Sequence, residues 1–238
     1  PENSEFPGKY PPPPAVKPLQ LTSDLDEAFV RRTSMIARAE MQPLGAFFGA
    51  VVAQEIVKIT GKYTPVHQFF NFHCAEVLPS NDYYASNPED FAPRNSRYDH
   101  NIAIFGAKVQ ERLVNLKLFM VGCGALGCEN IKNFALNGMC CGASGHLVVT
   151  DNDRIEISNL SRQFLFREDN VGQPKSVAAC NRMLSMNKGA KVDARQDFVG
   201  PTTQYLYPDA FWMQLDAVVN ALDNIEARLY VDKQCVLF

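Results

Sequence analysis

A glycine-rich loop, GCGALG at residues 122–127, lies between a short hydrophobic segment and a segment with a helical pattern. The hydrophobic residues Leu118–Val121 predict a buried strand, and residues 128–137 predict a helix that Gly138 ends. Glycines let the backbone approach a phosphate closely, and the start of a helix offers free N–H groups and a positive dipole end. The pattern therefore predicts a nucleotide-binding strand–loop–helix unit, but it does not identify the nucleotide.

The residues after the loop continue this alternation of strands and helices. Strands are predicted at His146–Thr150, Lys191–Arg195 and Ala217–Leu222, and a helix is predicted to begin near Pro174. Strands that alternate with helices along the chain are typical of a parallel sheet with helices on both faces. We therefore predict an α/β fold built on a doubly wound, mostly parallel, Rossmann-like sheet.

Acidic residues follow two of the predicted strands. Asp151 comes directly after residues 146–150, and Asp223 comes directly after residues 217–222. In doubly wound sheets, ligands bind outside the carboxyl ends of the strands. Asp151 lies 24 residues after Gly127, close to the position at which dinucleotide-binding folds carry their ribose-binding acid. Up to this point an NAD-dependent oxidoreductase fits the sequence.

A series of amide and cationic side chains after Asp151 favours a nucleoside triphosphate instead. The series is Asn159, Arg162, Gln163 and Lys175. Nicotinamide chemistry has no leaving group to stabilise. Attack on an α-phosphate, by contrast, releases pyrophosphate and builds up charge that Arg, Lys and Mg²⁺ can meet. Asp223 offers the hard oxygen ligand that Mg²⁺ prefers.

Each of these residues also has a simpler interpretation. Arg162 could form a surface ion pair, Lys175 could be a solvated side chain, and Asp223 could cap the following helix. We favour a catalytic role for Arg162 and Lys175 and a metal-binding role for Asp223, because all three follow one phosphate loop.

The residues before 98 have a different pattern. Proline-rich residues 1–20 predict an extended linker or tail. A helix capped by Ser23 is predicted next, followed by a helix at Leu44–Ile59 that is apolar nearly all round and is therefore expected to be buried. Residues 67–78 have a strand-like aromatic character, and the polar residues 79–97 predict a boundary.

The composition argues against several classes of protein. The net charge of −3 gives no basic surface for a nucleic acid, and no apolar run is long enough to span a bilayer. The seven cysteines are odd in number and show no C-x-x-C spacing, so neither disulfides nor a zinc site is expected. We predict a protein of the cytoplasm and nucleus, without a nucleic-acid or membrane partner.

Four runs of sequence together resemble the active adenylation half of eukaryotic ubiquitin-activating enzymes: VGCGALGCENIKNFALNG, VVTDNDRIEISNLSRQFLFR, VGQPKS and NALDNIEAR. The resemblance covers roughly residues 96–238, and residues 41–78 resemble the end of the inactive half. It implies a sheet of the ThiF/MoeB adenylation type in residues 96–238, truncated at its carboxyl end. Residues 21–95 would be a helical and strand remnant of a second copy.

The resemblance also implies roles for individual residues. The residues expected at the ATP phosphates are Gly122, Gly124, Gly127, Asn159, Arg162 and Lys175, with Gln163 nearby. Asp151 would bind the ribose, and Asp223 would hold Mg²⁺ with Asn224 beside it. The implied reaction joins the C-terminal glycine of ubiquitin to AMP, with ATP and Mg²⁺, before a thioester forms on a cysteine of another domain. No general base is needed, because a terminal carboxylate is already ionised near neutral pH.

Parts of the implied enzyme have no counterpart in this sequence. Single-half relatives carry an arginine where His100 stands, and fused members supply that arginine from the start of the inactive half. The thioester domain is expected after Phe238, and ubiquitin-conjugating enzymes would bind through further parts. We therefore expect this chain alone to be inactive. The alternatives are an NAD-dependent oxidoreductase, a non-catalytic interaction module, or an activator of a close ubiquitin relative.

Overall fold

The computed structural model describes residues 24–67 and 69–238, so the proline-rich residues 1–20 and Ser23 lie outside the described residues. The chain divides into two compact units, residues 1–37 and 38–238. In the first unit, helix α1 spans Glu27–Ile36, and the Asp26 carboxylate caps it by accepting from the Phe29 N–H at 2.9 Å. The N-cap of α1 is therefore Asp26.

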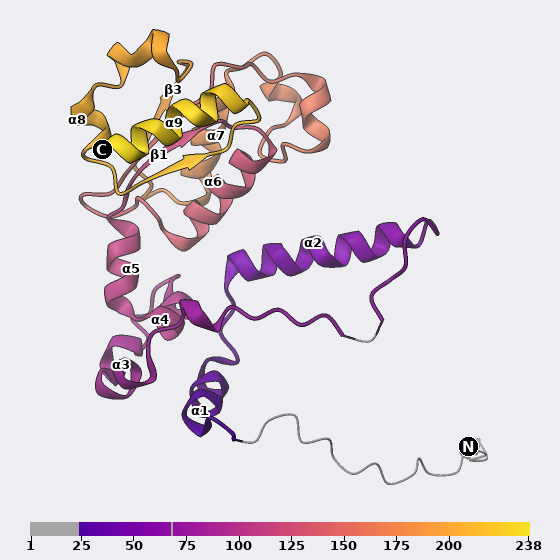
Figure 1. Ribbon diagram of the computed structural model, residues 1–238, viewed down its shortest axis with the longest axis vertical. Helices are drawn as coiled ribbons and strands as arrows, with labels where there is room; N and C mark the ends of the chain where they lie inside the picture. Colours follow the sequence, from indigo (N-terminus) through magenta and orange to yellow (C-terminus); the bar gives the residue numbers. More distant parts are fainter. Residues whose placement is uncertain (1–23, 68) are drawn as a thin grey trace. The chain divides into compact units, whose positions relative to one another are not determined.

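A parallel sheet of four strands forms the centre of the second unit (Figure 1). The strands are β1 (Lys117–Val121), β2 (His146–Thr150), β3 (Val192–Arg195) and β4 (Ala217–Asn220). Their order in the sheet is β3-β2-β1-β4, so the chain moves outward from β1 and then returns to its other side. Val121 at the end of β1 pairs with Thr150 and with Asn220, which brings three strand ends together.

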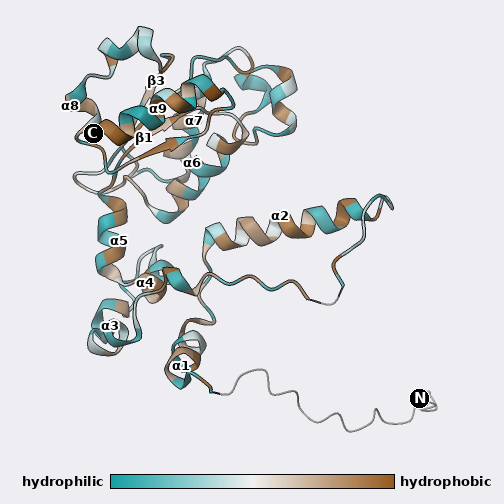
Figure 2. Ribbon diagram, viewed as in Figure 1, coloured by the Kyte–Doolittle hydropathy of each residue, from teal (hydrophilic) through white to brown (hydrophobic). Residues whose placement is uncertain are grey.

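Helices cover both faces of this sheet, which confirms the predicted doubly wound α/β fold. On one face, Met120 and Val149 pack among residues of α6 (Ala125–Asn137) and α7 (Lys175–Met186). On the other face, Phe119 packs with residues of α8 (Asp209–Trp212) and α9 (Ile225–Leu237). Burial on both faces explains why the two inner strands, β1 and β2, are largely hydrophobic, whereas the edge strand β3 (Val192–Arg195) alternates apolar and charged residues; Figure 2 colours the sheet by hydropathy.

A buried amide network attaches two shorter helices to the far end of α6. These helices are α4 (Asp99–Phe105) and α5 (Ala107–Val114). The Asn101 Nδ2 donates to Gln110 Oε1 at 3.2 Å and to Asn137 Oδ1 at 3.0 Å, and Gln110 Nε2 donates to the Asn137 carbonyl at 2.9 Å. Because α6 begins at the glycine loop, this network helps to fix the helix that carries the loop.

The remaining elements are short. They are α3 (Asn81–Ser86) and the 3-10 helices η1 (Ala75–Val77), η2 (Pro88–Phe91), η3 (Ile157–Ser161), η4 (Glu168–Asn170) and η5 (Pro201–Leu206). The polar stretch 79–97 therefore contains two ordered turns of helix. Among the described residues, no helix has the length and apolar composition required to cross a membrane.

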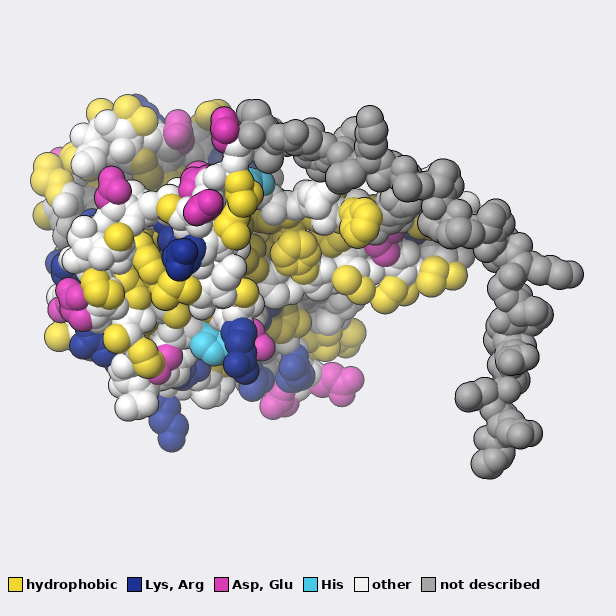
Figure 3. All heavy atoms as spheres, turned by 90° about the horizontal axis from the view of Figure 1, so that it is seen from below, with side chains coloured by type: hydrophobic (Ala, Val, Ile, Leu, Met, Phe, Trp, Pro, Cys, Tyr) yellow, Lys and Arg dark blue, Asp and Glu magenta, His cyan; other side chains and the backbone are white. Residues whose placement is uncertain are grey.

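Two predictions for residues 38–78 were wrong. Helix α2 (Gln42–Lys58) forms close to the predicted bounds, but none of its residues is buried. The described residues within 67–78 form no strand, because their aromatic rings pack on α2: Phe72 lies 4.5 Å from Phe47 and Phe70 lies 6.4 Å from Phe48, between ring centroids. Hydrophobic side chains therefore gather along α2 and the segment after it (Figure 3).

Candidate functional site

A cavity of about 700 Å³ opens at the edge of the sheet where β1, β2 and β4 end. The strand order reverses between β1 and β4, and such a reversal leaves a crevice between the loops that follow the two strands. Every predicted site residue except Gly127 lines this cavity. The lining residues from the prediction are Gly122, Gly124, Asp151, Asn159, Arg162, Gln163, Lys175, Asp223 and Asn224.

The three glycines of the loop differ in whether the fold could accommodate a side chain at their position. Gly122 has φ +102°, and a Cβ there would lie 2.6 Å from the Ala221 carbonyl oxygen. Gly127 lies inside α6, where a Cβ would collide with the Gly122 carbonyl oxygen, so its place in the fold is that of a packing residue outside the cavity. Gly124 is the N-cap of α6 and has ordinary backbone angles, and a Cβ there would meet no atom within 4 Å. The folded chain alone thus gives no reason for glycine at 124.

Asp151 joins the loops that follow β1 and β2. Its Oδ2 accepts from the Cys123 N–H at 2.6 Å, and its Oδ1 accepts from the Asp153 N–H at 2.8 Å. Burial raises the pKa of the Asp151 carboxyl, although these two hydrogen bonds and the Lys175 charge act in the opposite direction. Each carboxylate oxygen can accept a further hydrogen bond, so Asp151 can both hold the glycine loop and bind a hydroxyl group in the cavity.

Lys175, the first residue of α7, is almost buried and is not a solvated side chain. Its ammonium lies 2.7 Å from Asp153 Oδ2, with 9% of the lysine side chain and 61% of the aspartate side chain exposed. The backbone N–H of Lys175 also donates to the Asp153 carbonyl at 3.0 Å. Asp153 was not predicted as a site residue. The only signal in the sequence was that it is an acidic residue two positions after Asp151.

Arg162 has no ion pair among the described residues, so the surface ion-pair interpretation does not apply to it there. Its guanidinium is exposed at the cavity and donates to the Ser158 carbonyl at 3.0 Å. Asn159 is buried and structural in part, because its Oδ1 accepts from the Glu156 N–H at 3.0 Å. Gln163 is 3% exposed, and its Oε1 has no hydrogen-bond partner within the described chain.

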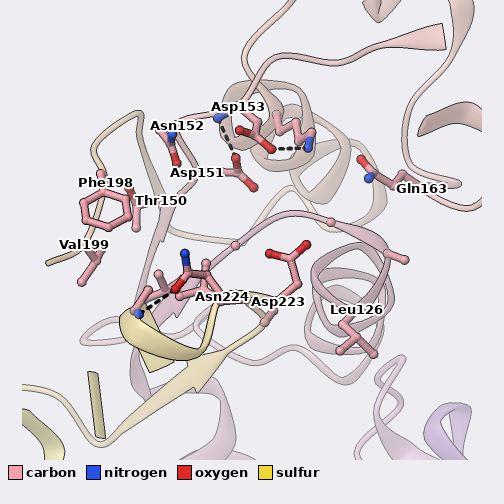
Figure 4. A pocket seen from close by; sticks show the side chains of 18 of the residues that line it. Leu126, Thr150, Asp151, Asn152, Asp153, Gln163, Phe198, Val199, Asp223 and Asn224 are labelled. Atoms are coloured by element: carbon pink, nitrogen blue, oxygen red, sulfur yellow. Dashed lines mark hydrogen bonds and ion pairs between the residues drawn. The ribbon is translucent and has the colours of Figure 1, made fainter. Parts of the chain in front are cut away.

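Asp223 does not cap α9, because Asn224 does: the Asn224 Oδ1 accepts from the Ala227 N–H at 3.1 Å. Arg228 donates to the Leu222 carbonyl from Nε at 2.6 Å and also from its terminal nitrogen. These contacts hold the chain on both sides of Asp223. Figure 4 shows the Asp223 carboxylate directed into the cavity, across from Asp151 and Asp153.

Carboxylates slightly outnumber cationic side chains around the cavity. The five carboxylates are Asp151, Asp153, Glu156, Asp197 and Asp223, and the four cations are Arg154, Arg162, Lys175 and Arg228. Within residues 24–67 and 69–238, no group of three or more His, Cys, Asp or Glu side chains is placed to hold a metal ion. Mg²⁺ is commonly bound by one or two carboxylates together with substrate phosphates. A single carboxylate such as Asp223 therefore suits a metal ion that enters the cavity together with the phosphates of a bound nucleotide.

One end of the cavity is apolar, and this feature was not predicted from the sequence. Phe198 and Val199 line it, and the Thr150 hydroxyl donates to the Asp197 carbonyl at 2.6 Å beneath them. A Cβ at Gly200 would collide with the Phe198 ring, so this glycine leaves room for the ring to lie where it does. A flat aromatic ligand group could stack against Phe198 at this end.

Residues 98–238, which contain this cavity and its loops, match the family model described as the ThiF family. The chain belongs to the ThiF family. Membership confirms the predicted sheet of the adenylation type. The chain has the same fold as the ThiF-like tRNA N6-threonylcarbamoyladenosine dehydratase TcdA of E. coli, solved in complex with ATP. The TM-score is 0.53 and the identity 22%, over 59% of this chain and 55% of that one.

Curated relatives confirm the resemblance drawn from the sequence. This ThiF-family chain is 51% identical over 216 residues to ubiquitin-activating enzyme E1 1 of Arabidopsis thaliana, covering 90% of this chain and 20% of that protein. It is 45% identical over 227 residues to ubiquitin-like modifier-activating enzyme 1 of Mus musculus, covering 95% and 21%. The chain thus spans about a fifth of the length of these relatives.

The cysteines of this ThiF-family chain are all free thiols. Burial raises the pKa of Cys128 to about 11 and the pKa of Cys140 and of Cys180 to about 12. The thiolate is the nucleophilic form of cysteine. These buried thiols are therefore packing residues and not nucleophiles at neutral pH.

Proposed function

We propose that this chain carries the ATP site of an enzyme that adenylates the C-terminal glycine of ubiquitin or of a ubiquitin-like protein. One observation carries the proposal: a glycine loop, an unpaired arginine, a nearly buried lysine and a free aspartate meet at a single cavity. The similarity to ubiquitin-activating enzyme E1 1 of Arabidopsis thaliana and to ubiquitin-like modifier-activating enzyme 1 of Mus musculus supports the choice of substrate. TcdA, a protein of the same fold, was solved in complex with ATP, which is consistent with the choice of nucleotide.

The roles we propose follow from where the side chains lie. The open space beside Gly124 and the free N–H groups at the start of α6 suit a phosphate. Asp151 can accept from a ribose hydroxyl, and the apolar end at Phe198 suits the base. Asn159, Gln163 and Asn224 line the same walls, and the unpaired Gln163 oxygen offers an acceptor.

The chemistry needs charge stabilisation more than proton transfer. The terminal carboxylate of the modifier attacks the α-phosphorus, the bond from that phosphorus to the bridging oxygen breaks, and pyrophosphate leaves. Arg162 and Lys175 would meet the charge that develops on the phosphoryl oxygens. Asp223 would hold Mg²⁺, which when bound supplies positive charge to the phosphates. Because carboxylates outnumber cations around the cavity, a polyphosphate would meet a more favourable field with a metal ion than without it.

We further propose the domain arrangement that the resemblance implies. Residues 96–238 would be the active adenylation domain, residues 21–95 the remnant of an inactive copy, and residues 1–20 a linker. The missing arginine, the thioester cysteine and the docking site for ubiquitin-conjugating enzymes would lie in other parts of a longer protein. The free thiols support the cytoplasm and nucleus as the location.

Calorimetric titration of the natural protein that carries this sequence tests the choice of nucleotide. We expect ATP to bind and the affinity to fall when Mg²⁺ is removed. Ubiquitin-dependent exchange of radiolabelled pyrophosphate into ATP would then report the adenylation step. NAD is the matched control ligand: tight NAD binding without an ATP signal would contradict the proposal in favour of an oxidoreductase.

A further inference from the structure

Lys175 occupies an electrostatically unfavourable place. It is 7% exposed, whereas the three arginines that line the cavity are exposed. It is also the first residue of the twelve-residue helix α7, where the helix dipole is positive and disfavours a cation. Removing an ammonium from water adds a further cost. The ion in this position requires a nearby anion, and Asp153 at 2.7 Å supplies one.

The backbone sets the position of Asp153 independently of the ion pair. The Lys175 N–H donates to the Asp153 carbonyl at 3.0 Å, and Arg154 forms an antiparallel bridge with Pro174. The Ile155 N–H donates to the Gln173 carbonyl at 2.9 Å. Residues 153–155 are therefore fastened to the segment before α7 by main-chain bonds. Truncating the Asp153 side chain removes the carboxylate and leaves the course of the loop in place.

The ion pair leaves Lys175 able to bind a ligand. A lysine ammonium has three N–H donors, and one of them is directed at Asp153 Oδ2. Both residues line the cavity, and 61% of the Asp153 side chain is exposed. The ammonium can therefore keep its bond to Asp153 while a second donor meets a phosphate oxygen. The Asp153 carboxylate at the same time adds negative charge where a polyphosphate would lie.

We propose that Asp153 is a positioning residue: it holds the Lys175 ammonium at the cavity wall for the transition state, at the expense of affinity for ATP. The inference rests on the proposed function. The two effects have opposite signs, since the ion pair orients the catalytic cation while the carboxylate repels the phosphates.

The test is ubiquitin-dependent ATP–pyrophosphate exchange, with kcat and the Kd for ATP measured separately. Asp153→Ala should lower kcat by about tenfold to a hundredfold, as expected for a misplaced catalytic group, and should leave the Kd unchanged or lower it. Asp153→Asn keeps an acceptor oxygen and should lose less of the rate. Equal losses in the two variants, an unchanged kcat, or a parallel loss of rate and affinity would overturn the inference.

Glu129→Ala is the matched control. Glu129 pairs with Lys132 at 2.6 Å on α6, and neither residue lines the cavity. This variant also removes one carboxylate from one ion pair, so its kcat and Kd should equal those of the wild type. A wild-type protein without ubiquitin-dependent exchange would refute the proposed function, whereas normal exchange by Asp153→Ala would refute only the positioning role.

A second measurement does not depend on activity. An amine-reactive ester applied to the ATP-free protein labels lysines according to their exposure and freedom, and peptide mass spectrometry gives the rate at each site. Labelling of Lys175 should be severalfold faster in Asp153→Ala than in the wild type, with Lys132 as the internal reference. Equal rates at Lys175 would show that Asp153 does not hold the ammonium.

Discussion

Two glycines of one loop are expected to respond in opposite ways to the same small change. Gly122→Ala adds a Cβ at 2.6 Å from the Ala221 carbonyl oxygen and places alanine at φ +102°. Backbone strain of this kind costs about 1–3 kcal/mol and overpacking about 1–3 kcal/mol more. Since 1 kcal/mol corresponds to about 2–4 °C for a domain of this size, we expect the Tm to fall by at least about 4 °C.

Gly124→Ala should fold normally and bind ATP poorly. The added Cβ meets no atom within 4 Å, and the backbone angles of −69° and −155° suit alanine. The weaker N-cap costs about 1 kcal/mol, which the lower entropy of the unfolded chain largely offsets. Because Gly124 lines the cavity at the start of α6, the methyl group would occupy space that a phosphate needs and should weaken ATP binding by about tenfold or more, or about 1.4 kcal/mol.

The assay combines a thermal melt with a calorimetric ATP titration on both variants and on the wild type. The Tm separates the two variants without any nucleotide, and the titration is interpreted only below the Tm of each protein. If Gly124→Ala binds ATP as tightly as the wild type, the glycine loop does not hold the phosphates. If Gly122→Ala has the same Tm as the wild type, the loop does not approach the chain after β4 as closely as described.

Three further outcomes are expected. Lys175→Ala should reduce ATP–pyrophosphate exchange by roughly 10²–10³-fold while weakening ATP binding much less, and Asp223→Ala should in addition raise the Mg²⁺ concentration that exchange requires; near-normal exchange in both would exclude the assigned roles. Because the pKa of Asp151 is raised above its ordinary value of 3.8, the folded state binds more protons than the unfolded state between the two values. The contribution of Asp151 to the free energy of unfolding therefore falls as pH rises through that window, and denaturant titrations should show a difference in slope between the wild type and Asp151→Asn. Cys123 is buried and its pKa is raised well above the usual range, so iodoacetamide should modify the exposed Cys235 and spare Cys123 in the native protein; equal modification by mass spectrometry would contradict its burial.

The inner strands of the sheet were predictable because they are buried on both faces and are therefore largely hydrophobic. Residues 146–150 were predicted at the bounds the structure has, and β4 ends only two residues earlier than predicted. The helix after the loop begins at Ala125 and not at Cys128. Glycine is a poor helix former, so the pattern placed Gly127 outside the helix, although its contact with the Gly122 carbonyl requires a residue without a side chain.

The site was predictable where residues follow strand ends and unpredictable where it depends on the path of loops. The pairing of Asp153 with Lys175 joins positions 22 residues apart, and nothing in their types specifies it. The apolar end at Phe198 depends on a turn after β3. The prediction that α2 is buried was wrong for a related reason. An apolar helix is expected to pack against other residues, but its sequence does not specify which part of a protein they belong to.

The close approach of three backbones has a mechanical consequence. The Ala221 carbonyl after β4, the Gly122 peptide and the first turns of α6 at Gly127 are stacked with no side chain between them. Nothing compressible separates these layers, so a shift of the glycine loop must carry the end of β4 with it, and with that the backbone that bears Asp223. The two walls of the cavity that these loops form should therefore move as one rigid body.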